Sequence, residues 1–392
     1  MDYNPGMRIK ATLQNLVWSG AALMVVLASA RVSGLDHVTI QRDGRPLHLA
    51  GKIVIEAVDG GVLLQDREGV LWAIPAEQLQ GRSEDDRLYT PMSRAELSAR
   101  LTEQLPGFRL HHTANYLFVY NTTPAYAQWC GALYERLYRA FRNYWQRRGF
   151  ALRDPEMPLV VLVFDSRESY MAYARSELGD AAGNIDGYYS LQTNRVTMFD
   201  LTGSRTTPGE FARAASAAQI NHLLARPGAE WMVATIIHEA THQLAYNCGF
   251  HQRLADVPLW VSEGLAVYFE TPDLASTRGW RNIGGIHAKR LEQFQRYLAE
   301  RNPDSLQTLI TDDDRFRHPE TANDAYAEAW ALTYFVIRRY AKQYHEYLQI
   351  MADKPPLIYD SPDERLEEFQ RIFGEDLQAF DAEFLEYMRT VR

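Results

Sequence analysis

The 392-residue chain has only two cysteines and no excess of basic residues. Two cysteines are too few for a disulfide-stapled scaffold or a thiolate zinc site. Lys and Arg number 41 against 50 Asp and Glu, and the resulting formal charge of −9 argues against a broad nucleic-acid or anionic-membrane surface. There is also no internal repeat and no low-complexity stretch, so we expect a folded chain with a substantial core.

One long apolar run lies near the amino terminus. Arg8 and Lys10 precede the run LVWSGAALMVVLASA at residues 16–30, which closes on the small-x-small triplet Ala-Ser-Ala. These features are typical of a secretory signal peptide, and the run is shorter than the ~20 residues of a membrane-spanning helix. We therefore predict a signal peptide over residues 1–30 and a secreted or periplasmic protein without a membrane span after its removal. An uncleaved N-terminal membrane anchor is the alternative.

If the protein is exported, its two cysteines could be oxidised. In an oxidising compartment Cys130 and Cys248 could form a disulfide, and two buried free thiols are the alternative. Their separation in the sequence does not decide between the two.

The segment after the apolar run has the pattern of short strands. Residues 37–75 carry Val, Ile and Leu runs separated by Asp-Gly and Glu-Gly pairs, a spacing typical of hairpin turns. We predict a small antiparallel β-domain of four or five strands over residues 36–80, either an SH3-like barrel or a sheet. A polar stretch then favours a linker over residues 81–106. An envelope or cell-wall component is the candidate ligand of this β-domain.

Residues 107–392 have a different character and form the predicted main domain. Strand patterns and a helix start occupy its first part, and nearly everything beyond residue 208 has helical periodicity. The expected elements are a strand at 115–120, a helix after Thr123-Pro124, a buried strand at 158–164, a capping box from Asp165 to Glu168, and a hairpin over 187–199. Together they predict an α+β domain with a mixed sheet and a mostly helical carboxy-terminal half.

The segment TIIHEATHQLAYNCGF, residues 235–250, holds the clearest chemical signal. It falls in a predicted helix over residues 230–247 that closes at Cys248-Gly249. Positions i and i+4 lie above one another on a helix, so His238 and His242 would present their imidazoles on one face and could share a Zn²⁺ ion. Glu239 would lie near the ion without ligating it, as a general base requires. The alternative is a helix whose histidines bind only to neighbouring groups.

A third ligand is available in the segment PLWVSEGLAVYFETP, residues 258–272. Pro258 can start a helix and Pro272 can stop it, and Glu263 lies one turn inside. Gly264 and Ala266 would let this helix pack closely against another one. Twenty residues separate His242 from Glu263, enough for a turn, a loop and a returning helix. A bare surface glutamate is the alternative.

The HEATH of residues 238–242, followed by WVSEGLAVYFE at residues 260–270, resembles the two-part signature of the gluzincin metallopeptidases. The second part is similar to the corresponding pattern of the aminopeptidase N family. The spacing between the two parts is close to that of this family and of thermolysin. A closer resemblance, over residues 110–390, is to a family of uncharacterised exported peptidase-MA-like proteins. The resemblance implies a gluzincin-like catalytic domain in which His238, His242 and Glu263 hold one zinc ion per chain. It also implies that Glu239 activates zinc-bound water.

Two further roles are less directly marked. The glycine-x-methionine-glutamate-asparagine motif of aminopeptidase N enzymes is missing, and the corresponding edge strand is Gly187, Tyr188 and Tyr189, which could align an extended peptide by strand addition. Ordinary strand packing is the alternative for the two tyrosines. Tyr326 matches the position of the family's tyrosine that stabilises the oxyanion, with a core tyrosine as the alternative. The other nine histidines, His251 among them, have no comparable spacing and are expected at the surface or hydrogen-bonded.

The sequence therefore predicts an exported zinc-dependent peptidase of the gluzincin type that acts on a peptide or protein substrate. Two alternatives stay open. One is a non-catalytic envelope-binding protein that keeps the metal, and the other is a processing hydrolase dedicated to a single partner. The intact HExxH motif and Glu263 favour an active enzyme over a degenerate site.

Overall fold

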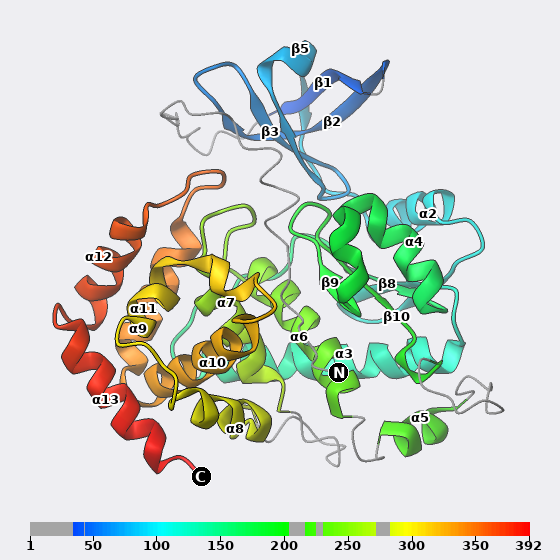
Figure 1. The fold of residues 1–392 in the computed structure, drawn as a ribbon. Helices are drawn as coiled ribbons and strands as arrows, with labels where there is room; N and C mark the ends of the chain where they lie inside the picture. Colours follow the sequence, from blue (N-terminus) through cyan, green and yellow to red (C-terminus); the bar gives the residue numbers. More distant parts are fainter. Residues whose placement is uncertain (1–33, 43, 204–215, 225–229, 272–282) are drawn as a thin grey trace.

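The structure is a computed structural model, and it describes residues 34–42, 44–203, 216–224, 230–271 and 283–392. The predicted signal peptide, residues 1–30, lies outside the described residues. Within the described ranges, no helix is both long enough and apolar enough to cross a membrane. Figure 1 shows the chain as an amino-terminal sheet, a second sheet flanked by helices, and a helical carboxy-terminal half.

The amino-terminal sheet is antiparallel, as predicted, and has the strand order β4-β3-β2-β1-β5. Its strands are β1 (Gly34–Arg42), β2 (Arg45–Glu56), β3 (Val62–Asp66), β4 (Leu71–Ile74) and β5 (Leu79–Leu88). The predicted linker over residues 81–106 is wrong, because β5 runs on to Leu88 against β1 and helix α2 (Arg94–Gln104) follows. The polar residues that suggested a linker belong to a strand whose side chains are mostly exposed, so hydrophobic alternation was missing there.

The second sheet is mixed and has the order β6-β7-β8-β10-β9. Its strands are β6 (Arg109–His112), β7 (Tyr116–Tyr120), β8 (Leu159–Phe164), β9 (Gly187–Tyr189) and β10 (Arg195–Phe199). Strands β7, β8 and β10 run parallel and are buried, which explains the continuous apolar sequences of β7 and β8. The predicted hairpin is the antiparallel pair of β9 and β10, and β9 ends the sheet.

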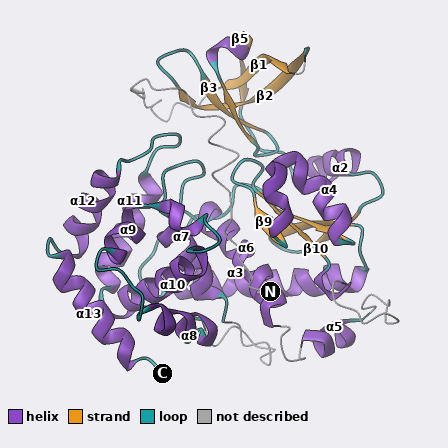
Figure 2. Cartoon of the chain, in the orientation of Figure 1, coloured by secondary structure: helices purple, strands orange, loops and turns teal. Residues whose placement is uncertain are grey.

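Helices cover both faces of this sheet (Figure 2). Helices α3 and α6 pack on one face, whereas α2 and α4 pack on the other. The described helices after α2 are α3 (Pro124–Gln146), α4 (Arg167–Leu178), α5 (Ala217–Leu224), α6 (Glu230–Asn247), α7 (Leu259–Phe269), α8 (Ala288–Tyr297), α9 (Ser305–Thr311), α10 (Ala322–Arg339), α11 (Ala341–Asp353), α12 (Pro362–Phe373) and α13 (Leu377–Thr390). The α+β class with a mostly helical carboxy-terminal half is therefore confirmed.

Local signals in the sequence indicated the starts of several helices. Thr123 caps α3, with Pro124 at the first helical position, as predicted. The capping box of α4 is one residue later than predicted: Ser166 caps the helix and Ser169 returns the bond. Both cysteines are buried and free, so the structure contains no disulfide between them.

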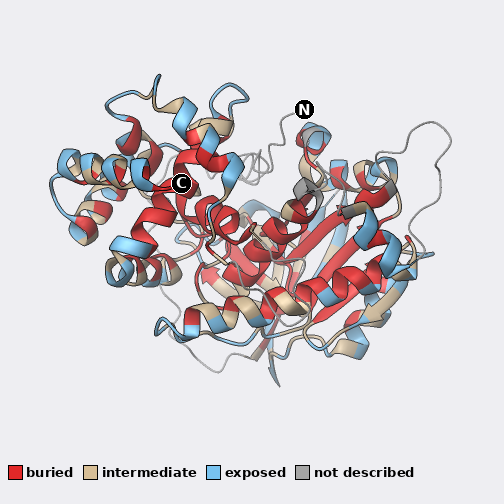
Figure 3. Ribbon diagram, turned by 90° about the horizontal axis from the view of Figure 1, so that it is seen from below, coloured by how far each residue is buried: buried red, intermediate tan, exposed pale blue. Residues whose placement is uncertain are grey.

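Helices α7 and α10 form the centre of the helical half, and most of their residues are buried. Figure 3 shows that buried residues concentrate in the interior of the protein. Gly264 makes their close approach feasible, as the sequence predicted. An added Cβ atom at Gly264 would lie 2.2 Å from the Thr333 Oγ1 atom and 2.7 Å from the Ala329 carbonyl oxygen. A larger residue would therefore push α7, and Glu263 with it, away from α10.

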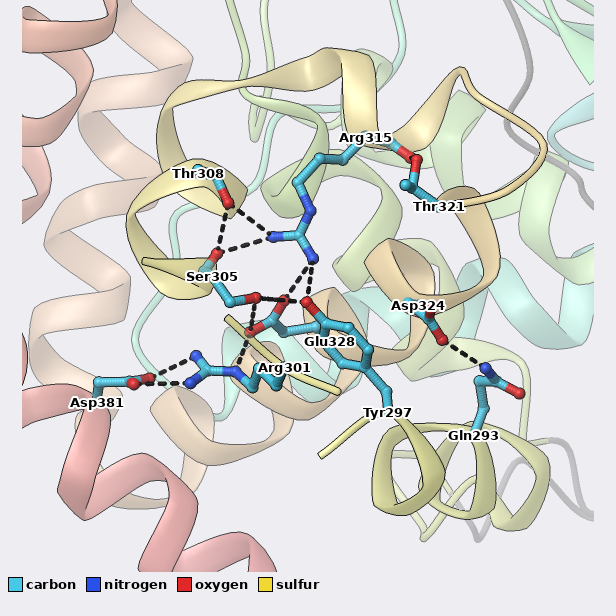
Figure 4. A network of polar contacts seen from close by, with 10 residues as sticks. All are labelled: Gln293, Tyr297, Arg301, Ser305, Thr308, Arg315, Thr321, Asp324, Glu328 and Asp381. Atoms are coloured by element: carbon cyan, nitrogen blue, oxygen red, sulfur yellow. Dashed lines mark hydrogen bonds and ion pairs between the residues drawn. The ribbon is translucent and has the colours of Figure 1, made fainter. Parts of the chain in front are cut away.

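A buried polar network holds the opposite side of α10 (Figure 4). Glu328 is fully buried and accepts from Arg301 at 2.8 Å, Arg315 at 2.8 Å and Ser305 at 2.8 Å. Arg301 also makes two bonds to Asp381 of α13. Residues two apart on a helix point to opposite faces, so this network anchors the face of α10 opposite to that of residue 326.

Candidate metal centre

Helix α6 places the two histidines of the HEATH segment together. It ends at Asn247, and Gly249 then adopts a φ of +94°, the left-handed conformation predicted for a residue after the helix. His238 and His242 lie one turn apart, with 3.1 Å between their Nε2 atoms. Both side chains are almost completely buried. A pair of imidazoles thus converges on one point inside the protein.

Helix α7 supplies the third group. Its apolar residues are buried on nearly all sides, and this burial carries Glu263 into the interior. One Glu263 oxygen lies 3.1 Å from His238 Nε2 and the other lies 3.5 Å from His242 Nε2. The three donor atoms all fall within 4.8 Å of one another. His238, His242 and Glu263 therefore form a buried group suited to hold a metal ion.

The spacing of these atoms fits a tetrahedral ion. Metal–ligand distances of about 2.0–2.1 Å place neighbouring tetrahedral ligands roughly 3.3 Å apart. The observed separations are 3.1–3.5 Å, with the two histidines facing different oxygens of Glu263. Two imidazole nitrogens and a carboxylate are ligands that zinc accepts, although other divalent metals accept them too. The geometry therefore supports a metal site without fixing which metal occupies it.

A carboxylate outside the ligand set orients His238. His287 caps helix α8 through Nδ1, which accepts from the Arg290 N–H at 3.4 Å, so its Nε2 carries a proton that it donates to Glu270 at 3.1 Å. The second oxygen of Glu270 accepts from His238 Nδ1–H at 2.6 Å. In its neutral form, His238 would then present the lone pair of Nε2 toward the other two ligands. This is how carboxylates commonly orient metal-binding histidines.

Sequence reasoning assigned no role to Glu270 or His287. A signal existed for the first of them, because Glu270 follows Glu263 by seven residues and so lies on the same face of α7 two turns later. His287 carried no such signal. It belongs to a separate element, α8, and only the tertiary fold brings it to Glu270.

The electrostatics of the group favour a positive charge at its centre. Burial lowers the pKa of His238, but hydrogen bonds and charges from Glu263 and Glu270 outweigh it and raise that pKa to about 10. Burial opposes ionisation of Glu263, yet the nearby histidines, His242 first, hold its pKa well below the usual range. A proton or a metal cation between these ligands supplies the charge that the carboxylates require.

Glu239 lies beside the triad and beside strand β9. One of its oxygens accepts from the backbone N–H of Tyr189 at 2.8 Å, and the other is buried without a hydrogen-bond partner among the residues that the structure describes. A Cβ atom on Gly187 would lie 3.7 Å from Glu239 Cγ, so the β9 backbone runs directly alongside this carboxylate. Burial raises the pKa of Glu239 to about 8. The structure thus brings together the predicted base and the predicted edge strand.

The tyrosines named from the sequence differ in their surroundings. Tyr188 donates its hydroxyl to Glu177 at 2.9 Å, and Tyr189 donates its hydroxyl to Asn194 at 2.7 Å, so both are engaged within the protein. The buried Tyr326 hydroxyl has no hydrogen-bond partner among the described residues. It lies near enough to Glu263 that burial first and this carboxylate second raise the Tyr326 pKa well above its usual value.

The expectation for His251 is wrong. This histidine is 2% exposed, and neither ring nitrogen has a hydrogen-bond partner in the described ranges. Its ring packs against Tyr246, 5.2 Å between centroids, and burial first and His242 second lower its pKa to about 3. The sequence gave no sign that His251 is buried, because it follows the turn at Gly249 and does not belong to a segment with helical or strand periodicity.

Comparison with known proteins covers part of this site. No curated protein matches the chain. Residues 232–358, less than half of the chain, match a family described as "Protein of unknown function (DUF1570)". The matched segment holds the three candidate ligands together with Glu239, and it leaves out strand β9 and the amino-terminal sheet.

Proposed function

We propose that the protein is an exported zinc-dependent peptidase of the gluzincin type, which hydrolyses peptide bonds at the His238, His242 and Glu263 centre. The observation that carries this proposal is the position of Glu239. A buried carboxylate with one unpaired oxygen lies beside three converging metal-ligand groups and an edge strand. A purely structural metal site requires no such group, because all its ligands come from the protein and no reactant is needed.

Hydrolysis of a peptide bond assigns a role to the metal ligands, to Glu239 and to the Tyr189 N–H. A bound divalent ion would polarise the scissile carbonyl and lower the pKa of a nearby water molecule. Glu239 would take the proton from the attacking water and deliver it to the leaving amine nitrogen. The Tyr189 N–H holds one Glu239 oxygen in place, which leaves the unpaired oxygen for this transfer.

Strand β9 and Tyr326 would act on the substrate. Within the described part of the chain, strand β9 pairs only with β10, at the end of the sheet, and it could align an extended peptide through its backbone. The hydroxyls of Tyr188 and Tyr189 are engaged, so their side chains would contribute packing rather than hydrogen bonds. Tyr326 would donate its unpaired hydroxyl to the carbonyl oxygen as negative charge develops there.

The test combines metal analysis with a peptide-library digest of the secreted protein, with chelator and after zinc is restored. The parent should contain about one zinc per chain and should lose cleavage with chelator. Glu239→Gln should keep the metal, because Glu239 is not a ligand, while turnover falls by roughly 10²-fold or more. Glu135→Gln is a control for the same substitution outside the site, because Glu135 accepts hydrogen bonds from Thr113 and Asn115 and not from candidate site residues.

Two outcomes would contradict the proposal. Unchanged turnover in Glu239→Gln would remove the general base from the mechanism. Stoichiometric metal in a parent that cleaves no peptide in the library would favour the metal-retaining binding protein or the hydrolase dedicated to one partner. Digests of envelope protein fractions would then separate those two alternatives.

A further inference from the structure

The hairpin between strands β3 and β4 reaches from the amino-terminal sheet to the turn between β9 and β10. Leu71 donates its backbone N–H to the Gln192 carbonyl at 2.9 Å. Arg253 joins the same two segments, because its Nη1 atom lies 2.9 Å from the Gly69 carbonyl oxygen and 3.3 Å from that of Leu191. The Gln192 carbonyl oxygen is a third acceptor at 3.4 Å. Figure 1 shows this hairpin pointing toward the end of β9.

The contact is buried and charged. Glu68, at the tip of the hairpin, pairs with Arg195 of β10 at 3.0 Å, and both side chains are only 9% exposed. Arg100 of α2 pairs with the other oxygen of Glu68 at 2.8 Å. Gly69 has a φ of +83°, and a Cβ atom there would lie 2.6 Å from Met157 Sδ. A tip this closely fitted cannot be a loosely tethered module.

Helix α6 holds the other side of the same turn. Asn194 and Asn247 exchange two side-chain hydrogen bonds of 2.9 and 2.7 Å. Gln243 donates to the Asn194 carbonyl at 3.0 Å, and the Tyr189 hydroxyl donates to the Asn194 side chain at 2.7 Å. The turn at residues 190–194 is therefore fixed between the metal-bearing helix on one side and the amino-terminal sheet with Arg253 on the other.

We propose that Arg253 is a positioning residue through which the amino-terminal sheet sets the place of strand β9 beside Glu239. The Tyr189 N–H that binds Glu239 lies just before the clamped turn, so a displaced turn moves this donor and the β9 backbone together. The role of β9 in holding substrate rests on the proposed function. The mechanical link from Arg253 to Tyr189 does not, because it consists of contacts within the protein.

This proposal gives the amino-terminal sheet a function in the site. A separate recognition module would touch the main domain through few buried groups and would move independently of it. Here a buried guanidinium satisfies carbonyl groups from both parts at once, which favours one fixed arrangement.

The experiment uses the full secreted chain with Arg253→Met, Arg253→Lys and the milder Glu68→Gln. Hydrogen exchange is measured over residues 186–199, zinc affinity by competition with a chromophoric chelator, and kcat and KM on a peptide that the parent cleaves. Arg142→Met is the matched control, because Arg142 also donates to a backbone carbonyl, that of Arg153, away from the turn.

We expect exchange over residues 186–199 to rise at least tenfold in Arg253→Met, less in Arg253→Lys and Glu68→Gln, and not in Arg142→Met. Zinc affinity should stay within twofold, since α6 and α7 keep their own contacts, while kcat/KM falls tenfold or more. Unchanged exchange over these residues in folded Arg253→Met would overturn the proposal. So would a rise spread evenly over the chain, because that indicates general destabilisation. If the parent cleaves no peptide, the proposed function fails and the exchange result still decides the role of Arg253.

Discussion

Replacing Glu270 by glutamine should weaken metal binding without touching a ligand. The amide is nearly isosteric, but it has one acceptor oxygen where the carboxylate has two. In the structure both oxygens accept, one from His238 Nδ1–H at 2.6 Å and one from His287 Nε2–H at 3.1 Å. The amide NH₂ group must therefore face one of these donors. His287 can change its tautomer only by giving up the bond that caps α8.

The magnitude can be worked out from this geometry. A hydrogen bond to a charged group contributes about 1.5–3 kcal/mol, and the bond to His238 is of that kind. Loss of the partner that orients a metal-binding histidine typically weakens metal affinity by about 10–100-fold, or roughly 1.4–2.7 kcal/mol. The two ranges overlap, so we expect the zinc dissociation constant of Glu270→Gln to rise by about 10–100-fold.

Competition with a chromophoric chelator measures this constant, and circular dichroism of the same samples reports whether the variant is folded. Glu135→Gln again serves as the control, because Glu135 is a half-buried glutamate that accepts from Asn115 and is not one of the candidate site residues. A zinc dissociation constant within twofold of the parent would refute the reasoning, because His238 would then keep its orientation without the carboxylate. The His287→Gln variant should lose less zinc affinity, since it changes only the hydrogen bond between His287 and Glu270 and leaves that between Glu270 and His238.

Two further predictions concern stability. Glu328→Gln removes the carboxylate shared by Arg301 and Arg315, whose side chains are 5% and 13% exposed, while Arg301 keeps Asp381 as a partner. It should therefore lower the free energy of unfolding by about 3 kcal/mol in a denaturant titration. A loss no larger than that of the exposed-pair variant Asp314→Asn would contradict this. His251→Leu removes two buried nitrogens that have no partner, so it should raise the free energy of unfolding by about 1 kcal/mol; a lower melting temperature would show instead that these nitrogens are satisfied in solution.

Much of the fold could be read from the sequence because its elements carry local signals. Continuous apolar runs identified β7 and β8, Thr123-Pro124 identified the start of α3, and the turn residues 192–194 identified the β9–β10 hairpin. The extension of the amino-terminal sheet through β5 was missed. Its side chains are largely exposed and its strand character comes from backbone pairing with β1, which leaves no hydrophobic alternation to detect.

The residues of the candidate site also differ in whether the sequence alone could identify them. His238, His242 and Glu263 were found because their spacing within two helices forces convergence, and the structure brings them within 4.8 Å. Arg253 and His287 were not found. Each acts through a partner far away in the sequence, the first on Gly69 and the second on Glu270, and no periodicity records such pairings.

The charges around the candidate centre favour a divalent cation there, and this reason is independent of the distances between the ligand atoms. Three carboxylates, Glu239, Glu263 and Glu270, are buried there, and among the described residues the ion pairs of the last two are with histidines alone. Buried carboxylates without compensating charge are strongly disfavoured. A single proton on His238 compensates one of them, whereas a divalent ion compensates two and frees both ligand imidazoles to stay neutral. Glu239 would then be the buried carboxylate without a dedicated counter-charge, and in the metal-free protein burial raises its pKa to about 8. A divalent ion beside it would favour the ionised form, which is the form that the proposed hydrolysis needs as its base.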